Sequence, residues 1–131
     1  MYYLIYTSDA CNDFQENDLK DLLLHSRHNN SRMGITGMLY YYDGVFIQLL
    51  EGNEKDVLNI ANTIKADARH QNFRILKEGN SDQRFFDNWD MGFKTLSVND
   101  TEEIKYFNEL NNAEVHDGSA IMKFFKILFQ K

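Results

Sequence analysis

The chain has 131 residues, of which 43% are hydrophobic and 14% aromatic, enough for one domain with its own core and too few for two. Its net charge is −6 and its basic residues form no dense stripe, which argues against binding of nucleic acid or of an anionic membrane. A single cysteine excludes an intramolecular disulfide, and the first residues carry no signal-peptide pattern, so we expect a soluble, cytoplasmic protein.

The first two predicted elements are a strand and a helix. Residues 2–8 alternate aromatic, aliphatic and β-branched side chains on both faces, which predicts a strand that is covered on both sides. Asn17 and Asp18 can cap a helix with apolar positions at helical spacing, and the polar cluster at residues 28–31 predicts its end.

A β-hairpin is predicted next. Residues 34–42 and 45–51 are typical of strands, and an Asp-Gly pair between them is the strongest short hairpin signal. A two-residue loop would place Leu39 opposite Gln48. The neighbours of Gln48 two positions away on either side are apolar, so its amide is expected among apolar side chains.

Asn53 can cap a second helix, which is expected to run to about Asp67 with an apolar stripe on one side. Residues 73–77 are typical of a fourth strand, and residues 91–95 of a short fifth strand. The order of these elements is the split β-α-β pattern. We therefore predict an α+β fold, a ferredoxin-like βαββαβ sandwich with an extra fifth strand and two C-terminal helices.

The two C-terminal helices are predicted over residues 99–110 and 119–130. The second is unusually apolar and could cover the sheet face that the first two helices leave bare, or dock a partner chain. We divide the chain into a core, residues 1–96, and a helical extension of the same globular unit, residues 97–131.

The sequence contains none of the usual catalytic or metal-binding patterns. His25 and His28 are spaced to share a metal ion, but no third ligand is in register, so surface histidines are favoured and no metal site is predicted. Cys11 lies in a polar segment without a neighbouring base, which favours an unreactive thiol. Enzyme catalysis therefore has little support.

Gln48 is the most unusual polar residue of the predicted sheet. Unpaired buried amide groups cost about 1–3 kcal/mol each, so its amide needs partners. Tyr6, on another strand, could supply its hydroxyl if it points to the same face, and a ligand could take the remaining bonds. A glutamine that faces solvent or a gap between helices is the alternative, and Gln48 alone does not decide between them.

Polar side chains near the helix ends provide the context. Asn29 and Asn30 either end the first helix in a turn or hold the edge of a planar ring with their amides. Arg69 either complements the dipole at the C-terminus of the second helix or lies beside the same cleft. If these side chains converge with Tyr6 and Gln48 between two apolar helix faces, they form a slot for a flat heteroaromatic group.

Six short motifs occur in the order and at the spacing of a known family. They are LIYTS at residues 4–8, SRHNN at 26–30, GITG at 34–37, FIQLLEG at 46–52, DARH at 67–70 and WDM at 89–91. Each motif alone is weakly specific. Together, over about residues 1–95, they make the chain closely resemble the BLUF domain, a blue-light sensor that uses a flavin.

This resemblance implies noncovalently bound FAD, with FMN as an alternative, inserted between the two helices of the core. Leu22 and Ile64 would flank the ring, and Asn30 would bond its pyrimidine edge. The residues implied to bind the cofactor are Tyr6, Leu22, Ser26, Asn29, Asn30, Phe46, Gln48, Ile64, Arg69 and His70.

The resemblance also implies a photochemical role for two residues. Tyr6 would donate an electron and a proton to the excited flavin, and the bridging amide of Gln48 would rearrange. Trp89 or Met91 would then carry the signal to the C-terminal helices. Asp90 departs from the serine that the family usually has there, and could alter how far Trp89 swings in. No substrate is converted, so we expect a signalling protein and not an enzyme.

Two other functions remain open at this stage. A small ferredoxin-like enzyme could use Glu51, Arg69 and His70 in acid–base or anion chemistry, although nothing places a nucleophile beside a base. A light-independent interaction module could bury the tyrosines of residues 40–42 and the C-terminal aromatic side chains against a partner, although cross-strand packing is favoured for the tyrosines. For a sensor we expect flavin and a downstream protein as partners, a homo-oligomer, and neither nucleic acid nor membrane.

Overall fold

Five strands and three helices make up the described part of the chain. The computed structural model describes residues 1–11, 16–84, 92–97 and 99–112. The strands are β1 (Tyr2–Ala10), β2 (Thr36–Tyr42), β3 (Val45–Gly52), β4 (His70–Asn80) and β5 (Gly92–Thr95), and the helices are α1 (Glu16–Met33), α2 (Glu54–Ala66) and α3 (Thr101–Asn112). The sheet order is β4-β1-β3-β2-β5, antiparallel throughout except that β5 runs parallel to β2.

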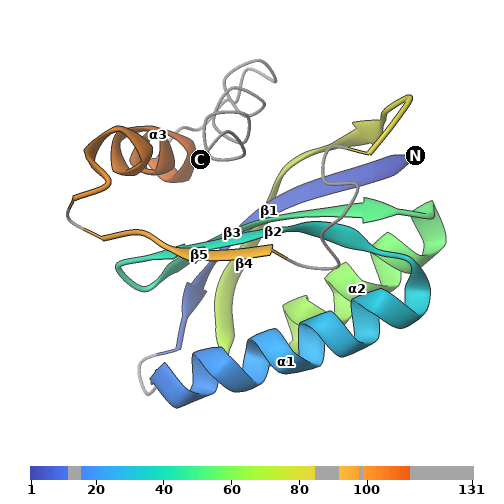
Figure 1. The fold of residues 1–131 in the computed structure, drawn as a ribbon, viewed down its shortest axis with the longest axis horizontal. Coiled ribbons are helices and arrows are strands. Elements are labelled where there is room, and N and C mark those ends of the chain that lie inside the picture. Colours follow the sequence, from blue (N-terminus) through green and yellow to red (C-terminus); the bar gives the residue numbers. More distant parts are fainter. Residues whose placement is uncertain (12–15, 85–91, 98, 113–131) are drawn as a thin grey trace.

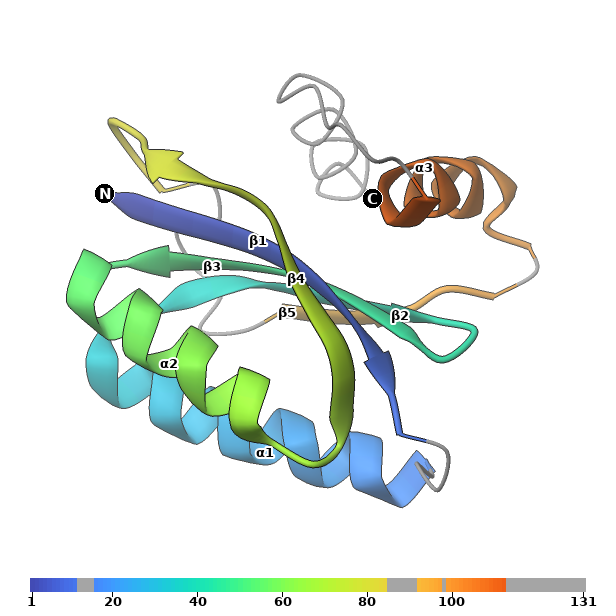
Figure 2. The same ribbon diagram turned by 180° about the vertical axis from the view of Figure 1, so that it is seen from behind.

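The sheet separates two layers of helix. Helices α1 and α2 lie side by side on one face, and α3 lies on the other (Figures 1 and 2). We call these the α1/α2 face and the α3 face. This arrangement confirms the predicted ferredoxin-like α+β fold with a fifth strand, while the helix predicted over residues 119–130 lies outside the described residues.

The α3 face is closed by α3, whose predicted range of 99–110 was two residues too early. Phe107 is 1% exposed and packs with Leu96, Tyr3 and Ile5 in one core cluster. The prediction that residues 119–130 cover this face stays untested, because α3 provides the cover among the described residues. None of the helices in the described ranges has the length and apolar character needed to cross a membrane.

Strand β1 is buried on both faces, as the alternation of its side chains predicted. Tyr2, Leu4 and Tyr6 belong to the core cluster on the α1/α2 face, whereas Tyr3 and Ile5 belong to the cluster on the α3 face. Helices α1 and α2 cover one face of β1 and α3 covers the other, so residues 2–8 of this strand are buried.

The hairpin of β2 and β3 is closed by Asp43 and Gly44, whose φ angles of 49° and 77° are those of a type I′ turn. This turn matches the right-handed twist of the strands and leaves only two residues in the loop. The register therefore places Leu39 opposite Gln48, as predicted.

Helix α1 is longer than predicted at both ends. It begins at Glu16, so Asn17 and Asp18 lie inside its first turn and do not cap it. It continues past residues 28–31 to Met33, because Gly34 adopts a φ of +68° and closes the helix there. The amides of Gly34 and Ile35 donate to the carbonyls of Ser31 and Asn30, the double bond of a Schellman motif.

Helix α2 has the predicted cap, because the side chain of Asn53 accepts a hydrogen bond from the amide of Lys55 at 3.0 Å. The following strand, β4, begins at His70 and not at residue 73 as predicted. Its pairing with β1 shifts between Thr7 and Asp9, and Asn72 there has a φ of 55°, so a β-bulge interrupts the alternation on which the prediction relied.

Candidate functional site

Tyr6 and Gln48 are brought together by the pairing of β1 with β3. The two residues lie directly opposite each other in an antiparallel ladder, so their side chains emerge on the same face. They are 1% and 2% exposed, and the hydroxyl of Tyr6 donates a hydrogen bond to Oε1 of Gln48. The contact that the sequence suggested is therefore present inside the core.

Aromatic rings hold the phenol of Tyr6 in a dry environment. Phe73 stacks on it with ring centroids 4.7 Å apart, and His70 meets it edge-on at 6.5 Å. Burial, together with the negative charge of Asp67, raises the pKa of Tyr6 far above its usual value. The phenol therefore keeps its proton at neutral pH and acts as the donor to the amide.

His70 is a second buried polar residue of this region. It is 7% exposed, its Nδ1 lies 2.8 Å from the hydroxyl of Ser8, and its ring packs 4.8 Å from that of Phe46. Burial lowers the pKa of His70 to about 4, even though the charge of Asp67 acts in the opposite direction. The imidazole is therefore neutral at pH 7.

Two buried nitrogen atoms near this region have no hydrogen-bond partner. They are Nδ2 of Asn30, a residue that is 2% exposed, and Nε2 of His70. A buried polar group without a partner costs about 1–3 kcal/mol, and such groups are few in native proteins. Both atoms are therefore suited to bind a polar group of a ligand.

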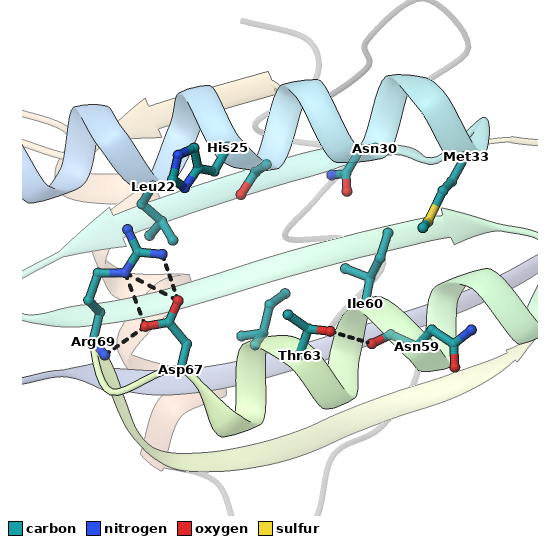
Figure 3. A pocket seen from close by; sticks show the side chains of 11 residues that line it. Leu22, His25, Asn30, Met33, Asn59, Ile60, Thr63, Asp67 and Arg69 are labelled. Atoms are coloured by element: carbon teal, nitrogen blue, oxygen red, sulfur yellow. Dashed lines mark hydrogen bonds and ion pairs between the residues drawn. The ribbon is translucent and has the colours of Figure 1, made fainter.

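A cavity of about 370 Å³ lies between α1 and α2. In Figure 3, Leu22, His25, Asn30 and Met33 project into it from α1, opposite Asn59, Ile60 and Thr63 of α2. Leu22 belongs both to the cavity wall and to the core cluster that contains Tyr6. The cavity therefore borders the layer of side chains in which Tyr6 lies.

Arg69 and Asp67 lie together at one end of the cavity (Figure 3). The guanidinium donates to Asp67 through Nη2 at 2.6 Å and through Nε at 3.0 and 3.2 Å to the two carboxylate oxygens. Hydrogen bonding to Arg69 lowers the pKa of Asp67, and the same bonding raises that of Arg69. Both groups are charged at neutral pH and present a charge-balanced pair to the cavity.

The cavity collects half of the residues that the sequence singled out. Leu22, Ser26, Asn30, Ile64 and Arg69 line it. The other predicted cofactor ligands with described side chains are buried in or beside the sheet and do not line it; they are Tyr6, Phe46, Gln48 and His70. The backbone of Asn29 is part of α1, but its side chain lies outside the described residues, as do the predicted relay residues Trp89 and Met91.

Several contributors were missed by the sequence reasoning. Thr63 and Asn59 are one turn apart on α2 and flank the apolar positions that were recognised, so their spacing could have indicated a second wall. Phe73 could not be assigned to Tyr6, because the β-bulge breaks the alternation of β4. Ser8 lies two residues after Tyr6 and therefore on the same face, which was the available signal for its contact with His70.

Asn29 and Asn30 are not a helix stop, since α1 continues for another turn. Because Asn30 stays helical, its side chain projects from α1 between the two helices (Figure 3). The prediction that these residues form a turn is therefore wrong. The prediction that the amide of Asn30 faces a ligand stays a prediction.

The positions of Glu51, Arg69 and His70 contradict the hypothesis that they form one catalytic site. Glu51 lies opposite Tyr3 on β1 and Thr36 on β2, so its side chain is on the α3 face. His70 packs against Tyr6 and Phe46 on the α1/α2 face, and the guanidinium of Arg69 is bound to Asp67. The three residues that this hypothesis needs together are separated by the sheet.

The tyrosines of residues 40–42 pack within the chain. Tyr40 is fully buried, Tyr41 packs 4.9 Å from Phe46, and Tyr42 meets Phe107 edge-on at 5.9 Å. These contacts agree with cross-strand and inter-layer packing, which the sequence favoured over a partner surface.

Comparison with known proteins identifies the family. The family described as BLUF, sensors of blue light using FAD, matches residues 1–92. A photoactivated adenylate cyclase subunit beta of Euglena longa is 34% identical over 67 residues, which are 51% of this chain and 8% of that protein. The chain therefore spans less than a tenth of this relative.

Solved structures agree over more of the chain. The photo-activated state of BlsA matches with a TM-score of 0.85 and 29% identity, covering 97% of this chain and 93% of BlsA. Klebsiella pneumoniae BlrP1, in a complex with FMN and cyclic diGMP, matches with a TM-score of 0.69 and 25% identity, covering 85% of this chain and 34% of BlrP1. With its fold, its motifs and a family match over residues 1–92, the chain belongs to the BLUF family of blue-light sensors.

Proposed function

We propose that this chain senses blue light through a flavin held noncovalently between α1 and α2, with Tyr6 as electron and proton donor and Gln48 as the switch. The observation that carries this proposal is the hydrogen bond from the buried hydroxyl of Tyr6 to the amide of Gln48, next to a cavity that Asn30 lines with an unsatisfied nitrogen. When bound, the flavin would supply the absorption of blue light and the acceptor for an electron.

The cavity has the chemistry that a flat ring with polar edges needs. Leu22, Ile60 and Ile64 provide apolar walls on the two helices. Asn30 offers an amide that can both donate and accept, which suits an imide edge. Asn29, Arg69 and His70 would assist it, Ser26 would lie beside the ring, and Phe46 would pack near Gln48.

Gln48 can work as a switch because the two ends of its amide differ. In the resting arrangement its Oε1 accepts a hydrogen bond from the hydroxyl of Tyr6. Rotation or tautomerisation of the amide exchanges an acceptor for a donor at the same position, so the hydrogen bonds offered to a neighbouring carbonyl change. Tyr6 holds its proton at the hydroxyl that faces this amide, so a proton that leaves Tyr6 is received at Gln48.

We propose FAD as the flavin and keep FMN as the alternative. The family is described as using FAD, whereas the BlrP1 structure holds FMN. The cavity between α1 and α2 has a volume of about 370 Å³, which lies in the range of small-molecule sites. The two cofactors share the ring system and differ in the tail attached to it. Mass spectrometry of the flavin released from purified protein distinguishes them.

We propose that the output passes through Trp89 or Met91 to the C-terminal extension, residues 97–131, and from there to a partner protein or to a second copy of the chain. Helix α3 is part of this extension and packs on the face of the sheet away from the cavity. A signal that starts at Gln48 must therefore cross the sheet.

The test is an absorbance difference spectrum between illuminated and dark protein. We expect the purified protein to be yellow and its flavin band to shift reversibly to longer wavelength under blue light. The Tyr6→Phe variant should still bind the flavin, because the aromatic ring that stacks on Phe73 remains. It should lose the light-induced shift of the flavin band, because the hydroxyl is absent. A wild-type flavin band that stays fixed under blue light would contradict the proposal.

A further inference from the structure

A buried polar network joins the ends of β2 and β3 on the α3 face. Glu51 is 0% exposed and Thr36 is 7% exposed. The hydroxyl of Thr36 lies 2.9 Å from Oε1 of Glu51, and Nη1 of Arg84 lies 2.9 Å from the same hydroxyl and 3.3 Å from the carbonyl oxygen of Glu51. Arg84 follows β4 in the chain, so the network connects three segments that are far apart in the sequence.

The direction of the hydrogen bonds in this network is determined by its chemistry. A guanidinium can only donate, so the hydroxyl of Thr36 accepts from Arg84. A hydroxyl has one proton, which Thr36 then donates to the carboxylate of Glu51. Thr36 is thus the link through which Arg84 and the Glu51 side chain are ordered relative to each other, and such chains of hydrogen bonds strengthen one another.

Burial of these groups is costly, which points to a role in positioning. Buried charged groups seldom add net stability compared with apolar residues of similar size, but they impose one geometry on the segments that carry them. Here the geometry concerns the connection between β4 and β5. Its first part is attached through Arg84 to Thr36 at the start of β2, and β5 pairs with β2 from Met38 onward.

The network and the switch share strand β3, because Gln48 and Glu51 both lie on it. Side chains alternate along a strand, so Gln48 faces the α1/α2 side and Glu51 faces the α3 side. In the sequence, Trp89 and Met91 follow Arg84 and precede β5. A displacement of β3 at Gln48 can therefore reach Arg84, which precedes these residues in the sequence.

We propose that Thr36 and Arg84 are positioning residues that couple strand β3 to the β4–β5 connection, so that a change at Gln48 is transmitted across the sheet. This inference rests on the proposed function, since it concerns how a light signal leaves the site. It adds two residues, on the face away from the cavity, that touch neither Tyr6 nor the cavity wall.

The experiment compares Thr36→Val with Thr36→Ser in flavin-loaded protein that contains all 131 residues. Valine keeps the shape and removes the link, whereas serine keeps the hydroxyl. Trp89 is the single tryptophan of the chain, so its fluorescence reports on the β4–β5 connection alone. We expect Thr36→Val to keep the wild-type light-induced shift of the flavin band and to reduce the light-minus-dark change in Trp89 fluorescence about fivefold, the factor that one lost hydrogen bond of ordinary strength allows.

Thr36→Ser should behave like the wild type, and Arg84→Gln should behave like Thr36→Val. Arg74→Gln, which removes an arginine on β4 outside the network, is the matched control and should leave the Trp89 change intact. An unaltered Trp89 change in Thr36→Val would overturn the inference, and so would a wild-type protein whose flavin band shifts without any change at Trp89. A wild-type protein without a flavin shift would instead refute the proposed function itself.

Discussion

The two faces of the sheet differ in the arrangement of the buried polar groups described above for each of them. On the α1/α2 face, Asn30 and His70 each keep a buried nitrogen without a partner, and Asn30 also lines an open cavity. On the α3 face, Thr36, Glu51 and Arg84 are hydrogen-bonded to one another. The first face offers buried nitrogen atoms to a ligand, whereas the three residues of the second are bonded to one another. In the function proposed above, this difference would separate the site that receives light from the structure that responds to it.

The largest expected effect comes from removal of the switch. Gln48→Leu should abolish the light-induced flavin shift completely, because no amide remains to rearrange. It should also lower the free energy of unfolding by about 1–3 kcal/mol, because the buried hydroxyl of Tyr6 loses its acceptor. Absorbance spectra under blue light and urea unfolding in the dark measure the two effects.

The matched control is Ile47→Val, one residue away on the opposite face of β3. It should cost about 1 kcal/mol of stability and retain the full shift. Loss of the light-induced flavin shift in Ile47→Val would mean that side chains on the α3 face are also needed for the shift.

Truncation on the α3 face should affect stability without changing the chromophore. Phe107→Ala removes a ring that is 1% exposed and should lower the free energy of unfolding by about 3–5 kcal/mol. The wavelength of the dark flavin band should stay the same at temperatures where the variant is folded. A displaced dark band would show that α3 acts on the cavity through the sheet even without light.

The third prediction concerns pH. The pKa of His70 is about 4 in the folded chain and about 6.5 in an unfolded one, so the unfolded state binds more protons between these values. The stability that the neutral imidazole contributes is complete above pH 6.5 and is lost as the pH falls toward 4. Between pH 7 and pH 5 the free energy of unfolding should fall by about 2 kcal/mol.

Denaturant unfolding at the two pH values checks this effect, with His70→Gln as the control. Glutamine can still bond to Ser8 but does not titrate, so most of the difference between pH 7 and pH 5 should disappear. Asp67, whose pKa is lowered, titrates below this range and leaves the comparison unaffected. An equal fall in both proteins would assign the pH dependence to other groups.

The smallest expected effect is at the unsatisfied amide. Asn30→Leu should raise the stability of flavin-free protein by about 1 kcal/mol, because a buried nitrogen without a partner is replaced by an apolar group. It should weaken flavin binding about tenfold, the loss that corresponds to one good hydrogen bond. Thermal unfolding and flavin titration measure the two changes, which have opposite signs.

Asn59→Leu is the control for this prediction, since Asn59 also lines the cavity but is exposed on α2. Its amide is hydrated in the absence of ligand. The stability of the flavin-free protein and the affinity for flavin should therefore change less in Asn59→Leu than in Asn30→Leu. If Asn30→Leu also destabilised the flavin-free protein, the amide of Asn30 would have a structural partner and the contrast between the two faces would fail.

The parts of the fold that depend on local chemistry could be predicted. The Asp43 and Gly44 turn sets the hairpin register, and through it the position of Gln48 opposite Leu39. The alternation of β1 predicted that both of its faces are buried. The end of α1 was misplaced because the polar residues at 28–31 favour a turn locally, while Gly34 and Ile35 close the helix one turn later. The preference of the polar residues 28–31 for a turn was outweighed by the capping motif that Gly34 and Ile35 complete.

By itself, the sequence determined the order of the elements, the faces of β1 and β3, and the residue types that a flavin site needs, because these follow from side-chain periodicity and turn chemistry between near neighbours. Only the tertiary structure decided that Phe73 stacks on Tyr6, that Asp67 holds Arg69 at the cavity, and that Arg84 meets Thr36 across 48 residues of chain. A β-bulge and a long-range hydrogen bond leave no periodic trace, because each depends on where two distant backbones meet. The ion pair is local, but its place at the cavity depends on how α2 and β4 are arranged in space.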